Sequence, residues 1–421
     1  MESGTSAIGL HTLSSAGCGL VFLATACSPD APPEPIEPVV IDLPAPNATL
    51  TERQFSKIRA PVRELEDGRL LMADLIENAL YVVDFGSGEV REIGSVGEGP
   101  TEYQRAGHLF ALGGDSTLFT DVTTRRWLVL AGDSVVNILR PAEPILLRLY
   151  RDAEELLGAD ASGRVLGVEG FAYRPEVAVG ISNKNADSLR FLISTGNALD
   201  QGSGEGVSEL ETVTEMGGRG RLGFKINRVE MVFQGREVYT NARTPSPLAS
   251  EAQAWLFKDG WIAVADPDPY RVDWRRPDGR WIRGDSLPVA LVPVDRRERC
   301  FAASPSESGE CDLDRYPGWP EHVPAFQMDT EAWRRIAPNG IALRPGPTGM
   351  LLVNRTRSAD HPENRFDVVD RTGALRGTIV VGANQTIVGA GRSSLYVTQK
   401  DDMDLLTLSR HPWPSELSAR D

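Results

Sequence analysis

Six polar side chains in this sequence stand at the ends of apolar blocks. The blocks read "DGRLLMAD", "GDSTLFTD", "SGRVLGVE", "KDGWIAVAD", "TGMLLVN" and "SSLYVTQ", and their last residues are Asp74, Asp121, Glu169, Asp266, Asn354 and Gln399. Carboxylate and amide oxygens bind cations and hydrogen-bond polar ligands, so such a set, if brought together, could form a ligand or cation site. The alternative is that each side chain caps its own turn by accepting backbone N–H bonds.

The spacing of these blocks predicts the elements that position the six side chains. Their last residues are 47, 48, 97, 88 and 45 positions apart, and most blocks precede a second β-type run after a short loop, as in "NALYVVDFGSGEV". A period of about 45 residues with about four strands is typical of a β-propeller blade. We therefore predict an all-β fold, a six-bladed β-propeller, with the six polar residues in a rough ring on the face where the inner strands begin.

Two alternatives to this architecture remain. The two long intervals are interpreted as insertions near residues 200–222 and 288–338, but a seventh blade results if "FQGREVYTNA" forms a blade of its own. A pair of β-sandwiches would explain the strands but not the period.

The glycine-rich stretch "GSVGEGPTEYQRAGHL" from Gly94 to Leu109 is interpreted as a connector between blades. A phosphate-binding loop needs G-x-G-x-x-G or a Lys-Ser/Thr at the start of a helix, and neither is present. We expect Gly97 and Gly99 to supply positive φ angles and Tyr103 to wedge between adjacent blades.

With "DGRLLMAD" before it and "FDVVDRTGALRG" near the end of the chain, "VGEGPTEY" resembles the NHL/TolB-like group of six-bladed propellers, which occur as bacterial lipoproteins. The connector of that group reads G-x-G-P-G-E-F; here Thr101 replaces the third glycine and Tyr103 the phenylalanine. The resemblance spans about Arg59 to His411. It implies architecture more than chemistry, because this fold hosts lyases, lactonases, sensors and scaffolds. Related propeller enzymes hold calcium or zinc at the mouth of the central tunnel, so calcium is the cofactor that the resemblance suggests.

The remaining chemistry-bearing residues give weaker signals. His108, His322 and His361 sit in unrelated repeat positions, with no spacing typical of a zinc site, and we expect His108 to be structural. The segment "DPDPYRVDWRRPDGRWI" could stack on a sugar or peptide, or could be a half-buried strand with a solvated face. No hydrolase motif such as G-x-S-x-G is present.

The N-terminus predicts export and a lipid anchor; the alternative is a buried apolar N-terminal segment in a cytoplasmic protein. Residues 1–26 contain the apolar run "AGCGLVFLATA" and are interpreted as a signal peptide. The following Cys27 ends "ATAC", which resembles a bacterial lipobox and implies lipidation of this cysteine. Residues 27–55 are rich in proline and are expected to form an extended tether, followed by the propeller over 56–414 and a tail over 415–421. The predicted location is the bacterial cell envelope, on the periplasmic or cell-surface side, with the lipid as the only membrane contact.

The cysteines indicate an oxidising compartment, and the net charge limits the classes of partner. Cys300 and Cys311 flank a polar, turn-rich loop and are expected to form a disulfide in an oxidising compartment. The net charge of −15 disfavours nucleic acid as a partner. We expect a non-catalytic binding or interaction module for a small molecule, peptide or protein. The alternatives are a metal-dependent propeller enzyme, a lactonase or lyase, and a structural scaffold.

Overall fold

The structure is a computed structural model, and it describes residues 39–121, 123–124, 126–139, 156–168, 188–195, 197–199, 210–217, 224–233, 236–245, 248, 250, 252–303, 311, 313, 318–327 and 342–418. These residues belong to a compact unit that begins at Glu37. Cys27, Glu169 and the expected signal peptide lie outside the described residues. Among the described residues, no helix is long and apolar enough to cross a membrane.

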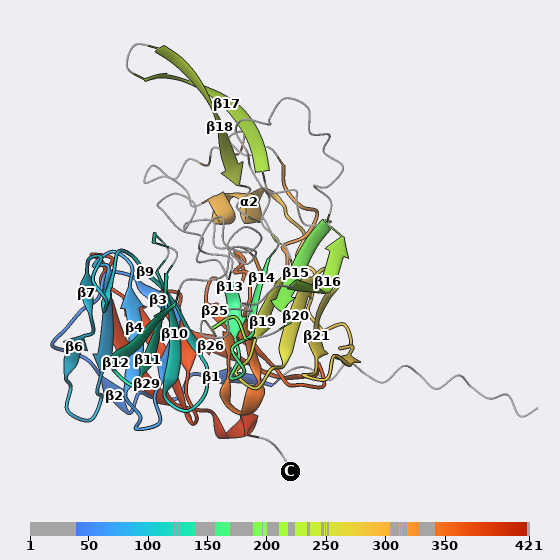
Figure 1. Cartoon of the computed structure of the whole chain (residues 1–421). Helices are drawn as coiled ribbons and strands as arrows, with labels where there is room; N and C mark the ends of the chain where they lie inside the picture. The colour runs from blue at the N-terminus through green and yellow to red at the C-terminus, as the bar shows by residue number, and fades with distance from the viewer. Residues whose placement is uncertain are drawn as a thin grey trace, which may run out of the picture. The chain divides into compact units, whose positions relative to one another are not determined.

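The first part of this unit consists of two antiparallel four-stranded sheets (Figure 1). Each runs in chain order from an inner to an outer strand. The first contains β3 (Ile58–Glu64), β4 (Leu70–Asp74), β5 (Ala79–Val83) and β6 (Val90–Glu92). The second contains β9 (Ala106–Ala111), β10 (Ser116–Asp121), β11 (Arg126–Ala131) and β12 (Ser134–Leu139).

The next two groups of four strands are joined through their inner strands into an eight-stranded sheet, where β13 runs parallel to β19 at Gly158 and Leu256. One group contains β13 (Leu156–Ala159), β14 (Val165–Val168), β15 (Ser188–Ser194) and β16 (Leu210–Gly217). The other contains β19 (Gln253–Leu256), β20 (Ile262–Pro267), β21 (Tyr270–Arg275) and β22 (Trp281–Ile282).

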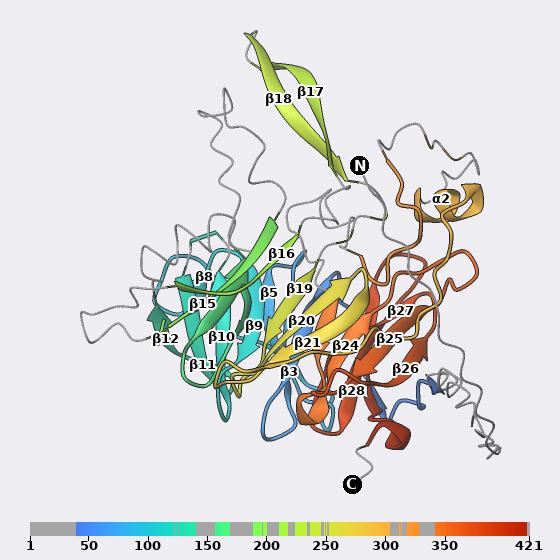
Figure 2. The ribbon, with the colours of Figure 1, turned by 90° about the vertical axis from the view of Figure 1, so that its right-hand side faces the viewer.

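The last part of the chain forms two further antiparallel groups, which Figure 2 shows beside the eight-stranded sheet. One contains β23 (Leu343–Pro345), β24 (Leu351–Asn354), β25 (Asn364–Val369) and β26 (Leu375–Val381). The other contains β27 (Gln385–Ala390), β28 (Ser394–Lys400) and β29 (Leu406–Pro412).

The innermost strands of these groups contact one another in cyclic order. Strand β3 contacts β9, β9 contacts β13, β13 contacts β19, β19 contacts β23, and β23 contacts β27, which returns to β3. Apolar side chains fill the spaces between neighbouring sheets, as where Leu71 and Leu80 of the first sheet pack with Leu109 and Phe119 of the second. A ring of antiparallel sheets, each buried only against its neighbours, is the arrangement of a β-propeller.

The expected tether of residues 27–55 is wrong for its last part, because the chain there forms edge strands. Strand β1 (Val40–Asp42) pairs parallel with β26, and β2 (Ala48–Thr49) pairs antiparallel with β29. An edge strand needs hydrogen bonds on one side only, so the prolines around β1 are tolerated. Ile41 is buried, and its neighbours Val40 and Asp42 are exposed, as a half-covered strand requires.

Two other expected boundaries also differ from the structure. Residues 210–217, expected within an insertion, form β16, because "LETVTEMG" pairs along its length with β15. The tail that was expected from residue 415 contains a short 3₁₀ helix, η5 (Ser415–Leu417), and Leu417 packs in the same core cluster as Ile41.

The segment that gives a seventh blade in the alternative interpretation lies in a two-stranded sheet instead. The first residue of "FQGREVYTNA" ends β17 (Phe224–Phe233), and residues 236–242 lie in β18 (Arg236–Pro245). Within the described residues these two strands pair with each other and with no other strand. The second insertion contributes helix α2 (Arg296–Ala303), and a disulfide joins Cys300 to Cys311.

Candidate functional site

Five of the six polar residues predicted as a ring lie where expected along their strands. Asp74 is paired opposite Ile58, Asp121 opposite Ala106, and Gln399 opposite Gln385, all at the beginning of inner strands. Asp266 comes directly after the residue that pairs with Gln253, and Asn354 directly after the residue that pairs with Leu343. Gln253 and Leu343 are the first residues of the inner strands β19 and β23. The polar ends of the second strands therefore share one face with the beginnings of the inner strands.

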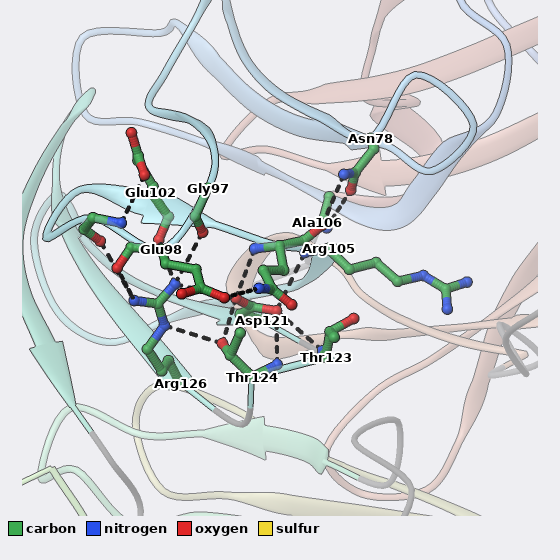
Figure 3. Close-up of polar contacts among 12 residues, drawn as sticks. Asn78, Gly97, Glu98, Glu102, Arg105, Ala106, Asp121, Thr123, Thr124 and Arg126 are labelled. Atoms are coloured by element: carbon green, nitrogen blue, oxygen red, sulfur yellow. Dashed lines mark hydrogen bonds and ion pairs between the residues drawn. The ribbon is translucent and has the colours of Figure 1, made fainter.

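Asp74 and Asp121 are fully buried, and each is surrounded by backbone N–H groups. Asp74 accepts hydrogen bonds from the amides of Ser56, Lys57, Ile76 and Glu77 at 2.7–3.1 Å. Asp121 accepts from the amides of Gln104, Arg105, Thr123 and Thr124 at 2.8–3.2 Å (Figure 3). Both carboxylates thus tie the second strand of a sheet to the chain that enters it, which is the capping role.

The other members of the predicted ring have separate surroundings. Asp266 accepts from the amide of Asp268 at 3.1 Å, and burial raises the pKa of its carboxyl group. The amide oxygen of Asn354 is buried and has no hydrogen-bond partner among the described residues. The amide oxygen of Gln399 accepts from Gln385 at 3.3 Å. In the described part of the chain, no three His, Cys, Asp or Glu side chains group as a metal site would require.

The glycine-rich connector presents carbonyl groups to a cation. The guanidinium of Arg126, from β11, donates to the carbonyls of Gly97, Glu98, Gly99 and Glu102 at 3.0–3.4 Å, and its Nη2 lies 3.7 Å from Asp121 Oδ2 (Figure 3). A phosphate-binding loop presents N–H groups instead, so this loop has the opposite polarity. The connector interpretation agrees with this geometry.

The predicted positive φ angles of Gly97 and Gly99 are not observed, whereas Tyr103 packs between neighbouring sheets as predicted. Gly94, not Gly97 or Gly99, has a positive φ, at 68°. A Cβ at Gly97 would lie 2.1 Å from Glu102 Oε2, so a larger residue there would force the Glu102 side chain to move. The buried Tyr103 accepts a hydrogen bond from the amide of Leu80 at 2.8 Å and packs edge-on against Phe119 of the next sheet.

A second group of polar side chains lies on the innermost strands, where a core is expected. Arg59 on β3, His108 on β9, Gln253 on β19 and Arg344 on β23 are all buried, with exposed fractions between 2% and 9%. Each is one of the first three residues of its strand, so the group lies near the same face as the polar strand ends. We call these four residues the central cluster.

Hydrogen bonding fixes the protonation of His108 within this cluster. Nη1 of Arg59 lies 2.7 Å from Nε2 of His108, and since a guanidinium only donates, Nε2 must be the acceptor. Burial, followed by the charges of Arg59 and Arg344, lowers the pKa of His108 well below its usual value. The imidazole is therefore neutral with its proton on Nδ1. That buried N–H has no hydrogen-bond partner in the described part of the chain.

Other residues considered from the sequence have structural roles. His411 lies between Ser409 Oγ and the carbonyl of Pro44, and His361 lies beside Arg365. In the aromatic and basic segment, Tyr270 and Trp274 are buried in the largest core cluster, so that most of it is a half-buried strand.

Sequence reasoning missed three members of the central cluster and judged the fourth, His108, to be structural. The signal that could have found them is a charged or polar residue in an inner-strand run, such as Arg59 in "KIRAPVRE" and Arg344 in "IALRPG". Buried charges are costly unless they are paired or used, so such residues stand out once the inner strands are assigned.

Comparison with known proteins identifies similar solved structures but no family. No family model matches the chain, and no curated protein matches it. The calcium-binding protein regucalcin from Agrobacterium tumefaciens is 12% identical over 89% of this chain and 97% of its own, with a TM-score of 0.36. A streptogramin B lyase is 11% identical over 87% of this chain and 86% of its own, at 0.35. A luciferin-regenerating enzyme is 11% identical over 88% and 96%, at 0.39. These identities are too low to transfer an activity.

Proposed function

We propose that this chain is a six-bladed β-propeller of the NHL/TolB-like kind that binds a small organic anion at the central cluster. Six blades are supported by the six inner strands, which contact one another in cyclic order: β3, β9, β13, β19, β23 and β27. Each is the inner strand of a group of four, because β2 joins β27–β29 as the fourth strand of the last group. What supports the anion is the sign of the groups on those strands.

The central cluster combines two guanidinium groups with a neutral imidazole that can donate from Nδ1. Burial, and then the permanent charges of Arg59 and Arg344, lower the pKa of His108, so both guanidinium groups act on this imidazole. The Nδ1–H of His108 adds a neutral donor that lacks an acceptor in the described residues. A carboxylate or phosphate oxygen supplies that acceptor and is favoured by both guanidinium groups. The single observation that carries the proposal is this buried, unpartnered N–H beside two arginines.

Thermal melting and calorimetric titration with citrate, acetate, phosphate and calcium chloride test the proposal. We expect at least one anion to raise the melting temperature of the wild type and to bind Arg344→Gln and His108→Gln at least about tenfold more weakly, which is about 1.4 kcal/mol. Arg280→Gln is the matched control, because Arg280 is an exposed arginine paired with Asp278, away from the cluster. The proposal is wrong if no anion binds, or if Arg280→Gln weakens binding as much as Arg344→Gln.

Catalysis is the second candidate function. Donors that bind an anion also stabilise negative charge that develops on a substrate, which a lactonase or lyase needs. The observation that favours this hypothesis is the neutral imidazole of His108, which accepts a hydrogen bond from Arg59. Calcium chloride is included in the titration because a metal-dependent enzyme would respond to it, although the described residues contain no metal-ligand group of three.

We further propose that the propeller is held at a bacterial envelope by lipid on Cys27, as the lipobox-like "ATAC" predicts. Expressed in a bacterial host, the wild type should partition with membranes and incorporate labelled palmitate. Cys27→Ala should lose both, and Cys18→Ala, which changes the cysteine in the expected signal peptide, is the control. Unchanged membrane association of Cys27→Ala would contradict the lipid anchor.

A further inference from the structure

A polar pocket of about 430 Å³ is lined by residues of strands β16, β20, β21 and β22. Thr214 and Met216 of β16 line it, with Asp266 of β20, Arg271 and Asp273 of β21, and Trp281 of β22. Its volume is within the range of small-molecule sites. It shares no residue with the central cluster.

Two side chains of this pocket keep hydrogen-bonding capacity. Asp266 Oδ1 accepts from the amide of Asp268, whereas its Oδ2 makes no hydrogen bond within the described residues and lies 3.7 Å from Arg271 Nη2, beyond hydrogen-bond distance. The Arg271 side chain is 34% exposed, and this Nη2 makes no hydrogen bond within the described residues. An acceptor and a donor therefore stand side by side.

The charges of the pocket exclude a charged ligand. Asp273 accepts from Arg283 Nη1 at 2.6 Å and from the amide of Gly284 at 3.0 Å, so this carboxylate is already satisfied. Asp266 and Asp273 balance Arg271 and Arg283. An anion would face two carboxylates and a cation two guanidinium groups, and each would disrupt existing ion pairs. A neutral ligand with adjoining donors and acceptors avoids this cost.

Hydroxyl groups have this property, because each both donates and accepts. One hydroxyl can donate to Asp266 Oδ2 while it, or its neighbour on the same ring, accepts from Arg271. The pocket also has an apolar wall of Trp281, Met216 and Val264, on which the C–H face of a sugar ring could pack. Arg283 lies over the Trp281 ring at 4.8 Å, and because its side chain is 64% exposed, it can move aside to free the ring face for a sugar.

We propose that this pocket binds a neutral saccharide, with Asp266 and Arg271 engaging its hydroxyl groups and Trp281 packing on its ring. The site is independent of the anion site, and either can exist without the other.

Saturation-transfer NMR with the methyl glycosides of glucose, galactose, mannose and N-acetylglucosamine tests the proposal on the full-length protein. We expect at least one glycoside to bind the wild type, and its Kd to rise at least tenfold in Asp266→Ala and in Trp281→Ala. Asp266→Asn, which keeps the shape of the side chain, should also weaken binding, and it keeps the test decisive if the alanine variants do not fold.

Asp278→Ala is the matched control, because Asp278 lies in the turn between β21 and β22 and pairs with exposed Arg280 outside the pocket. It should bind like the wild type, as should His108→Gln. The saccharide site is overturned if no glycoside gives saturation transfer, or if Asp266→Asn binds as tightly as Asp278→Ala. Loss of glycoside binding in His108→Gln alone would place the sugar at the central cluster instead.

Discussion

At the residue scale, the surroundings of a carboxylate decide what it does, and its position in the repeat does not. Asp74 and Asp121 each face four backbone N–H groups, which use their oxygens for capping. Asp266 stands at a related place near the end of β20, yet one of its oxygens makes no hydrogen bond within the described residues and faces a pocket. Substituting Asp266 should therefore affect binding more than stability, and substituting Asp74 the reverse.

The protonation of His108 gives the protein a dependence of stability on pH. The folded-state pKa of His108 lies well below its ordinary value of about 6.5, because the imidazole is buried beside Arg59 and Arg344. As pH falls below about 6.5, the unfolded chain takes up a proton that the folded chain does not. The stability that neutral His108 contributes is thus fully present above this pH and is lost as the pH decreases toward the folded-state value.

We predict that the free energy of unfolding of the wild type falls by up to about 2 kcal/mol more than that of His108→Gln between pH 7 and pH 5. This limit corresponds to one proton that the unfolded chain takes up between about pH 6.5 and pH 5 and the folded chain does not. Glutamine keeps an acceptor for Arg59 but does not titrate. Denaturant unfolding at both pH values measures the difference, with His361→Gln, an exposed histidine, as the control for removing an imidazole. Equal losses in the wild type and His108→Gln would show that His108 is not buried in its neutral form.

At the element scale, the connector shows how one sheet fixes the next. Strand β7 (Ser95–Val96) pairs with β8 (Glu102–Tyr103), and the loop between them closes around Arg126 of β11. Tyr103 meanwhile holds Leu80 of the first sheet and Phe119 of the second. The loop therefore joins the two sheets, because its carbonyls accept hydrogen bonds from Arg126. The Glu102 side chain lies against Gly97 and Gly99 of the same loop.

The strand ends could be predicted from the sequence, whereas the contacts between distant strands could not. The strand-turn-strand period located the ends of β4, β10, β24 and β28 to within a residue, because apolar alternation and Asp-Gly turns are local signals. The pairing of Arg126 with the connector, and of Arg59 with His108, joins residues 24–29 and 49 positions apart. No local signal carries such pairs, so the central cluster could not be assembled before the inner strands were placed side by side.

At the scale of the whole molecule, the N-terminal strands close the ring. Strand β2 is the outer strand of the sheet formed by β27–β29, so the beginning and end of the described chain share one sheet. Strand β1 extends the neighbouring sheet, with Thr378 donating to the carbonyl of Val39 and Leu43 to that of Val380. Nothing in the proline-rich composition of this segment indicates such a role, because composition reports chain stiffness and not the exposed strand edges that await it.

Removal of these strands should open the ring, and truncation measures the effect. A chain that starts at residue 52 loses the burial of Ile41 and Leu50 and the hydrogen bonds of Asn47 and Leu50 to β29. At about 2 kcal/mol for each aliphatic side chain and about 1 kcal/mol for each hydrogen bond, the loss is about 6 kcal/mol, a large share of the stability of a typical domain. A chain that starts at Glu37 retains both strands and should melt like the full-length chain, whereas the shorter chain should melt at a much lower temperature or without a cooperative transition. Equal melting temperatures for the two chains would mean that β27–β29 and β3 hold the ring closed by themselves.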